Sequence, residues 1–249
     1  MKLLDQFNFV SIDTLNQKNL LSDRQDRKFV ISSEALPEIL NACLAEYDVL
    51  EIAGIRNFKY TTNYFDTLGL HMYHEHQRGK QNRCKIRTRF YVDSQMGFVE
   101  VKVKNNKDRT VKHRVMGIEL SAGKSLIETN TQYSIEELEQ VFELQYKRIT
   151  LLHKNKLEKV TIDSELTYAK GSHRFNIEQL IFAEVKTNDA HDITFCQIMK
   201  SMGIRNGSLS KYCLGVISFY PNIKQNSFKL FLKKIFKIPA NATNEHTGI

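Results

Sequence analysis

Apolar runs of membrane-spanning length are missing from this sequence. A transmembrane helix needs about 20 consecutive, predominantly apolar residues, and no segment approaches that length. The N-terminus also lacks the pattern of a secretory signal, because Asp5 interrupts the apolar stretch that such a signal requires. We therefore expect a soluble, cytoplasmic protein.

Cysteine and proline are scarce. The chain has three prolines and four cysteines, and no two cysteines form a Cys-x-x-Cys pair. We expect four reduced thiols rather than a disulfide framework, because 249 residues are enough to bury a stabilising core. No internal repeat and no long low-complexity linker is visible, which indicates one large domain or two small ones.

Acidic residues are outnumbered by basic ones. The chain has 36 Lys and Arg against 28 Asp and Glu, which gives a formal net charge of +8 and an isoelectric point near 9.2. This balance favours anionic partners, namely nucleic acid, nucleotides, polyphosphate or an acidic membrane surface. It carries no information about the fold.

Two segments in the middle of the chain, 84–91 and 98–104, alternate charged with apolar residues. Successive side chains of a strand point to opposite faces of the sheet. Each segment therefore predicts a strand with one apolar face and one charged, mostly basic face. The charged faces contain Lys85, Arg87, Arg89, Glu100, Lys102 and Lys104. Such a surface suits a chain of negative charge.

Similar patterns predict further strands and a few helices. The other strands are expected at 24–31, 59–66, 112–120, 144–152, 160–166 and 180–186. Helices are expected after Ser32 and Ser33 to about Glu46, from the capping box at Ser134 to about Phe142, and from Asp192 to Met202. Strands dominate and follow one another as hairpins. The predicted fold class is α+β, an antiparallel β-barrel of about eight strands with helices packed outside.

Charged faces recur along these later strands and can either line a lumen or face water. Two like charges ~7 Å apart repel by roughly 2–2.5 kcal/mol at an effective dielectric constant of about 20. An enclosed lumen of cations is therefore costly unless it binds an anion or is offset by carboxylates. The inward carboxylates expected here are Asp26, Glu100, Asp163 and Glu184. A solvated charged face, common on antiparallel sheets, remains the alternative.

A series of motifs resembles one protein family. The motifs are Arg24-x-Asp26-x-Lys28-Phe29, YTTNYFDT, KIRTRFY, VEVKVK, Tyr146-Lys147-Arg148, Thr161-Ile162-Asp163, Glu184-Val185-Lys186 and Ser210-Lys211-Tyr212. In this order they resemble the VTC domain, the polyphosphate polymerase module of the vacuolar transporter chaperone family. That family belongs to the wider triphosphate tunnel metalloenzyme, or CYTH-like, superfamily. The resemblance covers about residues 22–216.

The resemblance implies a β-barrel tunnel that binds ATP, another triphosphate or polyphosphate, and that holds Mg²⁺ or Mn²⁺. Carried over by motif, the catalytic phosphate ligands are Lys28, Arg87, Arg89, Lys102, Arg148 and Lys211. Further phosphate-binding residues are Lys104, Lys112, Arg114, Tyr146, Lys159, Lys186 and Ser210. The implied metal ligand is Glu184. The tunnel domain would span 24–220, between an N-terminal arm or helix at 1–23 and a C-terminal segment at 221–249.

The sequence departs from the superfamily pattern in two places. The broad signature Glu-x-Glu-x-Lys is Arg24-x-Asp26-x-Lys28 here, so that one acid is lost and the other shortened. This change weakens a two-metal triphosphatase reading and leaves the number of metal ions open. Lys159 stands where the polymerase branch tends to have Arg, which removes a bidentate donor.

The resemblance implies a metal-dependent phosphotransferase that adds the terminal phosphoryl group of ATP to a polyphosphate chain. No catalytic triad is apparent, and none is needed if a phosphate oxygen is the nucleophile. Two alternatives stay open: a tripolyphosphatase or nucleoside triphosphatase, and a polyphosphate-binding protein without turnover. Specific nucleic-acid binding is not expected, since no RNP-type aromatic pattern is present. The oligomeric state is open.

Two other features have competing interpretations. The basic amphipathic run 226–238 can cap the barrel, which we favour, or lie on an anionic membrane, which would place the protein at the inner face of that membrane. His71, His74 and His76 are spaced like metal ligands, but no acid or cysteine completes the set in the sequence. We expect a polar role in a loop or at a strand edge for these histidines.

Overall fold

The computed structural model describes residues 3–17, 25–106, 110–189, 191–207, 209–229 and Leu232. Within them the chain forms an α+β fold with one large sheet of eleven strands and six α-helices. The strands are β1 (Phe9–Val10), β2 (Gln25–Ser32), β3 (Tyr47–Leu50), β4 (Phe58–Thr67), β5 (Arg83–Tyr91), β6 (Met96–Lys104), β7 (Thr110–Met116), β8 (Leu138–His153), β9 (Glu158–Lys170), β10 (His173–Ile177) and β11 (Leu180–Thr187). The helices are α1 (Ile12–Gln17), α2 (Leu36–Cys43), α3 (His71–Gln77), α4 (Lys124–Asn130), α5 (Thr194–Ser201) and α6 (Lys211–Phe219).

The main path of the sheet is antiparallel and runs β2-β11-β9-β8-β4-β5-β6-β7. In the described part of the chain no pairing joins the end strands β2 and β7. The expected closed barrel is wrong in this respect, because the ladder of hydrogen bonds stays open. Lys28 on β2 and Lys112 on β7 lie on the charged face of these end strands.

The sheet nevertheless curls around its charged face. Lys102 on β6 lies near enough to Glu184 and Lys186 on β11 for their charges to shift its pKa. Four strands of the sheet path separate β6 from β11. Lys85 on β5 likewise interacts with the charge of Lys28 on β2. We call this concave, charged face, which carries Lys28, Lys85, Lys102 and Glu184, the inner face.

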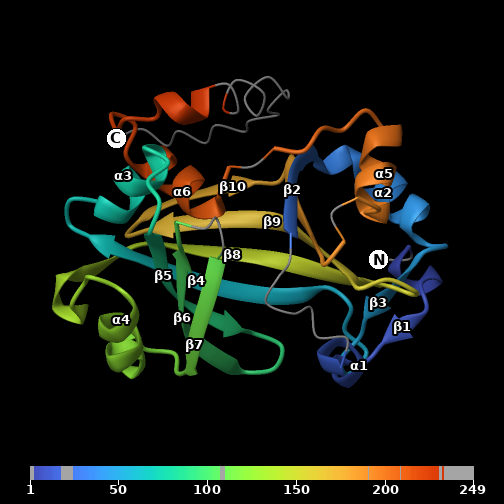
Figure 1. The fold of residues 1–249 in the computed structure, drawn as a ribbon, viewed down its shortest axis with the longest axis horizontal. Coiled ribbons are helices and arrows are strands. Elements are labelled where there is room, and N and C mark those ends of the chain that lie inside the picture. The colour runs from blue at the N-terminus through green and yellow to red at the C-terminus, as the bar shows by residue number, and fades with distance from the viewer. Residues whose placement is uncertain are drawn as a thin grey trace.

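Helices cover the opposite, outer face with apolar contacts. Helices α2 and α5 lie side by side at one end of the sheet (Figure 1) and bury a cluster of aliphatic residues from β8, β9 and β11. Helices α3 and α4 bury Ile86, Val99 and Val101 of β5 and β6. The apolar half of the predicted alternation is thus confirmed as core.

Helix α6 differs from the other helices because it packs on the inner face. Tyr212 contacts Tyr64 and Phe142, and the same core cluster includes Tyr146 and Phe182. Gly215 is required for this approach, since a Cβ at this position would lie 2.4 Å from the Phe142 ring. Helix α6 therefore fills one end of the space that the curled sheet encloses.

The predicted strands coincide with β2, β4, β5, β6, β7, β8, β9 and β11, although β8 begins at Leu138 rather than at 144, β7 ends at Met116 and β9 extends to Lys170. The predicted helix from Ser134 to Phe142 is wrong beyond its first turn. The capping box of Ser134 and Glu137 is present, but only the 3-10 turn Ile135–Glu137 follows before β8 begins. Val141 and Phe142 are both buried in the core, next to an irregularity in the pairing of β8 with β4.

Parts of both terminal segments are described. Strand β1 pairs in parallel with β3, so the N-terminal arm joins the edge of the sheet. Of the C-terminal run 226–238, only 226–229 and Leu232 belong to the described residues, and Leu232 packs in the cluster around α6. The expected amphipathic helix lies mostly outside the described residues. None of the helices described has the length and apolar character needed to span a bilayer.

Candidate functional site

The first group of charges on the inner face surrounds Glu100. Its carboxylate is completely buried and forms an ion pair with Arg87, in which Nη2 lies 2.6 Å from Oε2. Lys112 also pairs with it, and Arg89 Nη1 lies 3.8 Å from its Oε2 atom. Burial opposes ionisation, but Arg87, Arg89 and Lys112 together hold the pKa of Glu100 far below its usual range. A permanent anion on β6 thus fixes three cations from the two neighbouring strands, β5 and β7.

The second group of charges surrounds Asp163 on β9. Arg148 donates to its two carboxylate oxygens at 2.6 and 2.8 Å, and Lys211 Nζ lies 2.6 Å from Oδ2. Lys211 is the first residue of α6, so this pair also orients the helix. Burial opposes ionisation, yet Arg148 and Lys211 lower the pKa of Asp163 below its usual value.

Two tyrosines form a platform between these groups. The rings of Tyr60 and Tyr146 stack with centroids 5.2 Å apart and an interplanar angle of 6°. Arg89 and Arg148 lie over both rings, with 5.3 to 5.9 Å between each guanidinium carbon and the ring centroids. The Tyr146 hydroxyl is buried without a hydrogen-bond partner among the described residues. The platform thus holds two guanidinium groups beside an unused hydroxyl.

The third group is built on β2 and β11. Lys28 and Glu184 are direct partners across the two strands, and their charged atoms are 3.8 Å apart. Lys186 Nζ lies 3.7 Å from the same carboxylate oxygen. Burial opposes ionisation, but Lys186, Lys28 and Lys102 lower the pKa of Glu184 well below its usual value. These ion pairs are about 1 Å longer than those of Glu100 and Asp163, so Glu184 is the most loosely held of the three carboxylates.

Asp26 places a second carboxyl group beside Glu184. Burial and the charge of Glu184 raise the pKa of Asp26, and the two side chains share a hydrogen bond. Among the described residues no group of three or more His, Cys, Asp or Glu side chains could hold a metal ion. A hard divalent cation bound with a polyphosphate needs only one or two carboxylates, since phosphate and water supply the other oxygens. Glu184 with Asp26 fits that requirement.

The structure gathers the sequence-predicted phosphate ligands on one face. The six residues expected to be catalytic lie on the inner face or at the start of α6, which borders it: Lys28, Arg87, Arg89, Lys102, Arg148 and Lys211. Lys104, Lys159 and Lys186 share that face by their register. Arg114 is exposed and lies over the Phe98 ring, 4.9 Å from its centroid.

Ser210 has a local role as well. Its hydroxyl oxygen accepts a hydrogen bond from the Cys213 amide and thereby caps α6. The hydroxyl hydrogen is still able to donate to an anion in front of the helix.

Two inner-face residues were not assigned a role from the sequence. The strand register places Tyr60 on the inner face, because it is the direct partner of Tyr146 on β8 and of Tyr91 on β5. Lys85 was recognised as part of the charged face and opens the KIRTRFY motif, but it was given no role, although it is the partner of Lys102. The alternation within β4 and β5 was the signal that could have identified both.

The histidine motif lies on helix α3 rather than in a loop or at a strand edge. The His76 ring contacts the Cys84 carbonyl oxygen at 3.2 Å and accepts a hydrogen bond from Arg83 Nε. Burial, with the charges of Lys85 and Arg83, lowers the pKa of His76 to about 2. The ring is a neutral structural group, as its two contacts show.

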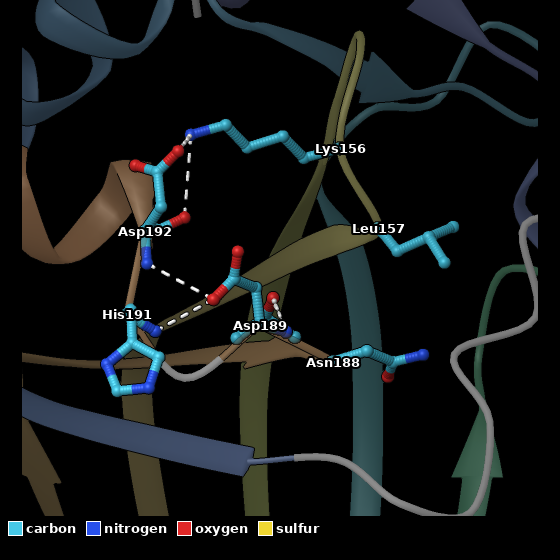
Figure 2. Close-up of a pocket in the computed structure, with 7 residues that line it drawn as sticks. Lys156, Leu157, Asn188, Asp189, His191 and Asp192 are labelled. Atoms are coloured by element: carbon cyan, nitrogen blue, oxygen red, sulfur yellow. Dashed lines mark hydrogen bonds and ion pairs between the residues drawn. The ribbon is translucent and has the colours of Figure 1, made fainter.

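A surface cavity of about 730 Å³ lies outside the inner face, next to the β8–β9 connection and the segment before α5 (Figure 2). Its charged groups already have partners: Lys156 Nζ lies 2.7 Å from the Asp192 carboxylate, and the Asp189 carboxylate accepts hydrogen bonds from the backbone amides of His191 and Asp192. The cavity therefore lacks the converging cations that distinguish the inner face.

Comparisons with solved structures agree with this fold. A proposed adenylate cyclase from Bacillus halodurans superposes with a TM-score of 0.52 at 12% identity, covering 80% of this chain and 99% of the other. A proposed adenylyl cyclase from Hippeastrum, described as having a dominant triphosphatase activity, gives a TM-score of 0.50 at 13% identity, covering 78% and 95%. At these identities the similarity shows the fold alone.

Sequence comparisons identify the family. No curated protein matches the chain. The family model of the VTC domain, in contrast, matches residues 23–220, which include every inner-face residue described above. The chain therefore belongs to the VTC domain family.

Proposed function

We propose that this protein is a metal-dependent phosphotransferase that extends polyphosphate with the terminal phosphoryl group of ATP. The observation that carries the proposal is the enclosed row of cations from six strands and α6, arranged around Glu100, Asp163 and Glu184. Membership of the VTC domain family supports the same activity. Phosphoryl transfer needs positioning and charge neutralisation more than covalent chemistry from the protein, and this surface supplies both.

In the proposed reaction an oxygen of the terminal phosphate of the chain attacks the γ-phosphorus of ATP. The bond from that phosphorus to the β-phosphate oxygen breaks, and ADP leaves. Arg87, Arg89 and Arg148 offer planar donor pairs to the phosphate oxygens, whereas Lys28, Lys102 and Lys211 act as point charges. Tyr146 offers a hydroxyl donor. No side chain serves as nucleophile.

Glu184, with Asp26 beside it, would hold Mn²⁺ or Mg²⁺. A bound divalent ion would neutralise charge on the phosphate oxygens. The loose ion pairs of Glu184 to Lys28 and Lys186 leave its oxygens the most accessible to such an ion.

A triphosphatase is the second candidate. The fold similarity to the Hippeastrum protein, which is described as having a dominant triphosphatase activity, favours it. Water would then replace the phosphate chain as the attacking group. The two candidates differ in product, since hydrolysis gives free phosphate and polymerisation gives longer chains.

Incubation of the purified protein with ATP and Mn²⁺, followed by electrophoresis of the products, tests the proposal. Chain growth is expected for the wild type and for Lys59→Met, a control at an exposed position of β4. Free phosphate as the main product would favour the triphosphatase. Tight tripolyphosphate binding without turnover, in folded protein, would instead indicate a binding protein, and competition with RNA would show whether that binding is specific for phosphate chains.

A further inference from the structure

Two facing lysines on the inner face have no ion-pair partner among the described residues. Lys85 on β5 and Lys102 on β6 are direct partners across the antiparallel ladder. In the part of the chain that the structure describes, neither ammonium group takes part in an ion pair or a hydrogen bond. Arg87, Arg148, Lys112 and Lys211 each have a carboxylate within 2.6 Å, so the pair is an exception on this face.

This arrangement costs free energy in the folded protein. The Cα atoms of directly opposed residues on antiparallel strands lie about 4.5–5.5 Å apart. Like charges in such positions repel each other. Burial, together with neighbouring cations, lowers the pKa of both lysines. Some of these cations belong to strands at the other end of the sheet path. The charge of Lys28 on β2 lowers the pKa of Lys85, and the charge of Lys186 on β11 lowers the pKa of Lys102. The charge of Glu184 acts on Lys102 in the opposite sense, but among the described residues no carboxylate lies within ion-pair distance of either lysine, so the site stays electropositive.

The pair also extends the basic row along the sheet. Lys85, Arg87 and Arg89 are successive inner-face residues of β5, so that Lys85 and Arg89 are about 13 Å apart at 3.3 Å per residue. The arginines are already neutralised in part by Glu100, whereas the lysine pair is not. A short anion fits beside one of these clusters, and an extended anion spans both.

We propose that Lys85, which has no assigned role, binds the phosphate chain together with Lys102 and forms a subsite used by extended polyphosphate. The inference deepens the proposed function, because it assigns residues that hold the acceptor chain. The subsite lies on β5 and β6, beside Arg87 and Arg89 of β5. Lys28 on β2 and Glu184 on β11 are near enough to interact with its charges. A phosphate oxygen there would satisfy two ammonium groups at once.

Calorimetric titration of the variant Lys85→Met tests this subsite, with Lys59→Met as the matched control on the outer face of the neighbouring strand. The probes are inorganic pyrophosphate and long-chain inorganic polyphosphate, in the absence of ATP and metal. We expect Lys85→Met to weaken polyphosphate binding about tenfold, to reduce the slope of log K against log salt by about one, and to change pyrophosphate binding less than about twofold. Lys85→Arg should stay within about twofold of the wild type for both probes.

Two results would overturn the inference: an unchanged polyphosphate affinity in Lys85→Met, or equal losses for the two probes. Thermal unfolding gives a second readout, because removal of an unpaired, partly buried charge should raise the melting temperature, and a fall would contradict the unpaired state of Lys85. Binding is measured without turnover, so a failure to synthesise polyphosphate would refute the proposed activity without affecting this result.

Discussion

Arg148 and Asp163 form a two-point ion pair on facing positions of β8 and β9, with N–O distances of 2.6 and 2.8 Å. Asp163 also holds Lys211 at the start of α6. One buried carboxylate thus positions two proposed phosphate ligands that are 63 residues apart in the sequence (211 − 148). The site is prepared by anions that belong to the protein.

Asp163→Asn should therefore destabilise the protein. The substitution leaves Arg148 and Lys211 partly buried without their counter-ion, and breaking a buried pair costs about 3–5 kcal/mol. Chemical denaturation measures the loss in free energy of unfolding. The control is Glu165→Gln, which removes a largely exposed partner of Lys147 and should cost under about 1 kcal/mol.

The pH dependence of that loss provides its own check. The pKa of Asp163 is lowered in the folded state, so its stabilising contribution is complete above its ordinary value of 3.8 and disappears as the pH falls below it. The difference in unfolding free energy between wild type and Asp163→Asn should shrink on acidification. A difference that grows at low pH would contradict this assignment.

Tyr146→Phe should separate binding from stability. The buried hydroxyl of Tyr146 has no partner among the described residues, so its removal should leave the free energy of unfolding unchanged or higher. If the hydroxyl donates to phosphate, tripolyphosphate affinity should fall about tenfold, the equivalent of about 1.4 kcal/mol. Calorimetric titration and denaturation measure the two quantities.

Tyr168→Phe is the matched control for that experiment. The hydroxyl of Tyr168 donates to the Lys211 carbonyl oxygen at 3.2 Å, and its removal should cost about 1 kcal/mol of stability. A destabilised Tyr146→Phe with unaltered tripolyphosphate affinity would show that the Tyr146 hydroxyl has a structural partner instead.

The lowered pKa of Lys112 predicts that tripolyphosphate binding weakens in mildly alkaline solution. Burial, opposed by the charge of Glu100, lowers the pKa of Lys112 to about 8. Its ammonium group loses a proton as the pH rises through that value, so tripolyphosphate binding should weaken between about pH 7 and 9. Lys112→Met should bind more weakly at pH 7 and lack this inflection. An inflection that persists in the variant would assign the titration to another group.

Arg89→Ala should abolish most of any phosphotransfer activity. Its guanidinium group lies over both platform tyrosines and near Glu100, and removal of one such positioned donor typically costs about 10²–10³ in rate. Arg89→Lys should recover only part of the rate, because a point charge cannot donate two parallel hydrogen bonds. Full activity in folded Arg89→Ala would remove this residue from the site.

The alternation of charged and apolar residues was enough to predict most of the sheet. The charged residues of β5 and β6 lie on one face, as the period of two requires: Lys85, Arg87, Arg89, Glu100, Lys102 and Lys104. Ile86, Val99 and Val101 are buried on the other face. The VTC resemblance, confirmed by the family match, predicted which cations gather.

Long-range relationships could not be read from the sequence. The open edge between β2 and β7 is a relationship between strands that are distant in the chain. The insertion of α6 against Phe142 depends on Gly215 meeting one particular ring. The capping box at Ser134 indicated a helix, but the burial of Val141 and Phe142 in the core favoured a strand. Local propensity was overridden by tertiary packing in that segment.

A crystal structure with a non-hydrolysable ATP analogue and Mn²⁺ tests the central claim most directly. The account predicts the triphosphate on the inner face, within hydrogen-bond distance of Arg87, Arg89 and Arg148, and the metal ion on Glu184. A triphosphate bound elsewhere, for example in the surface cavity beside Lys156 and Asp192, with the inner face unchanged, would contradict it.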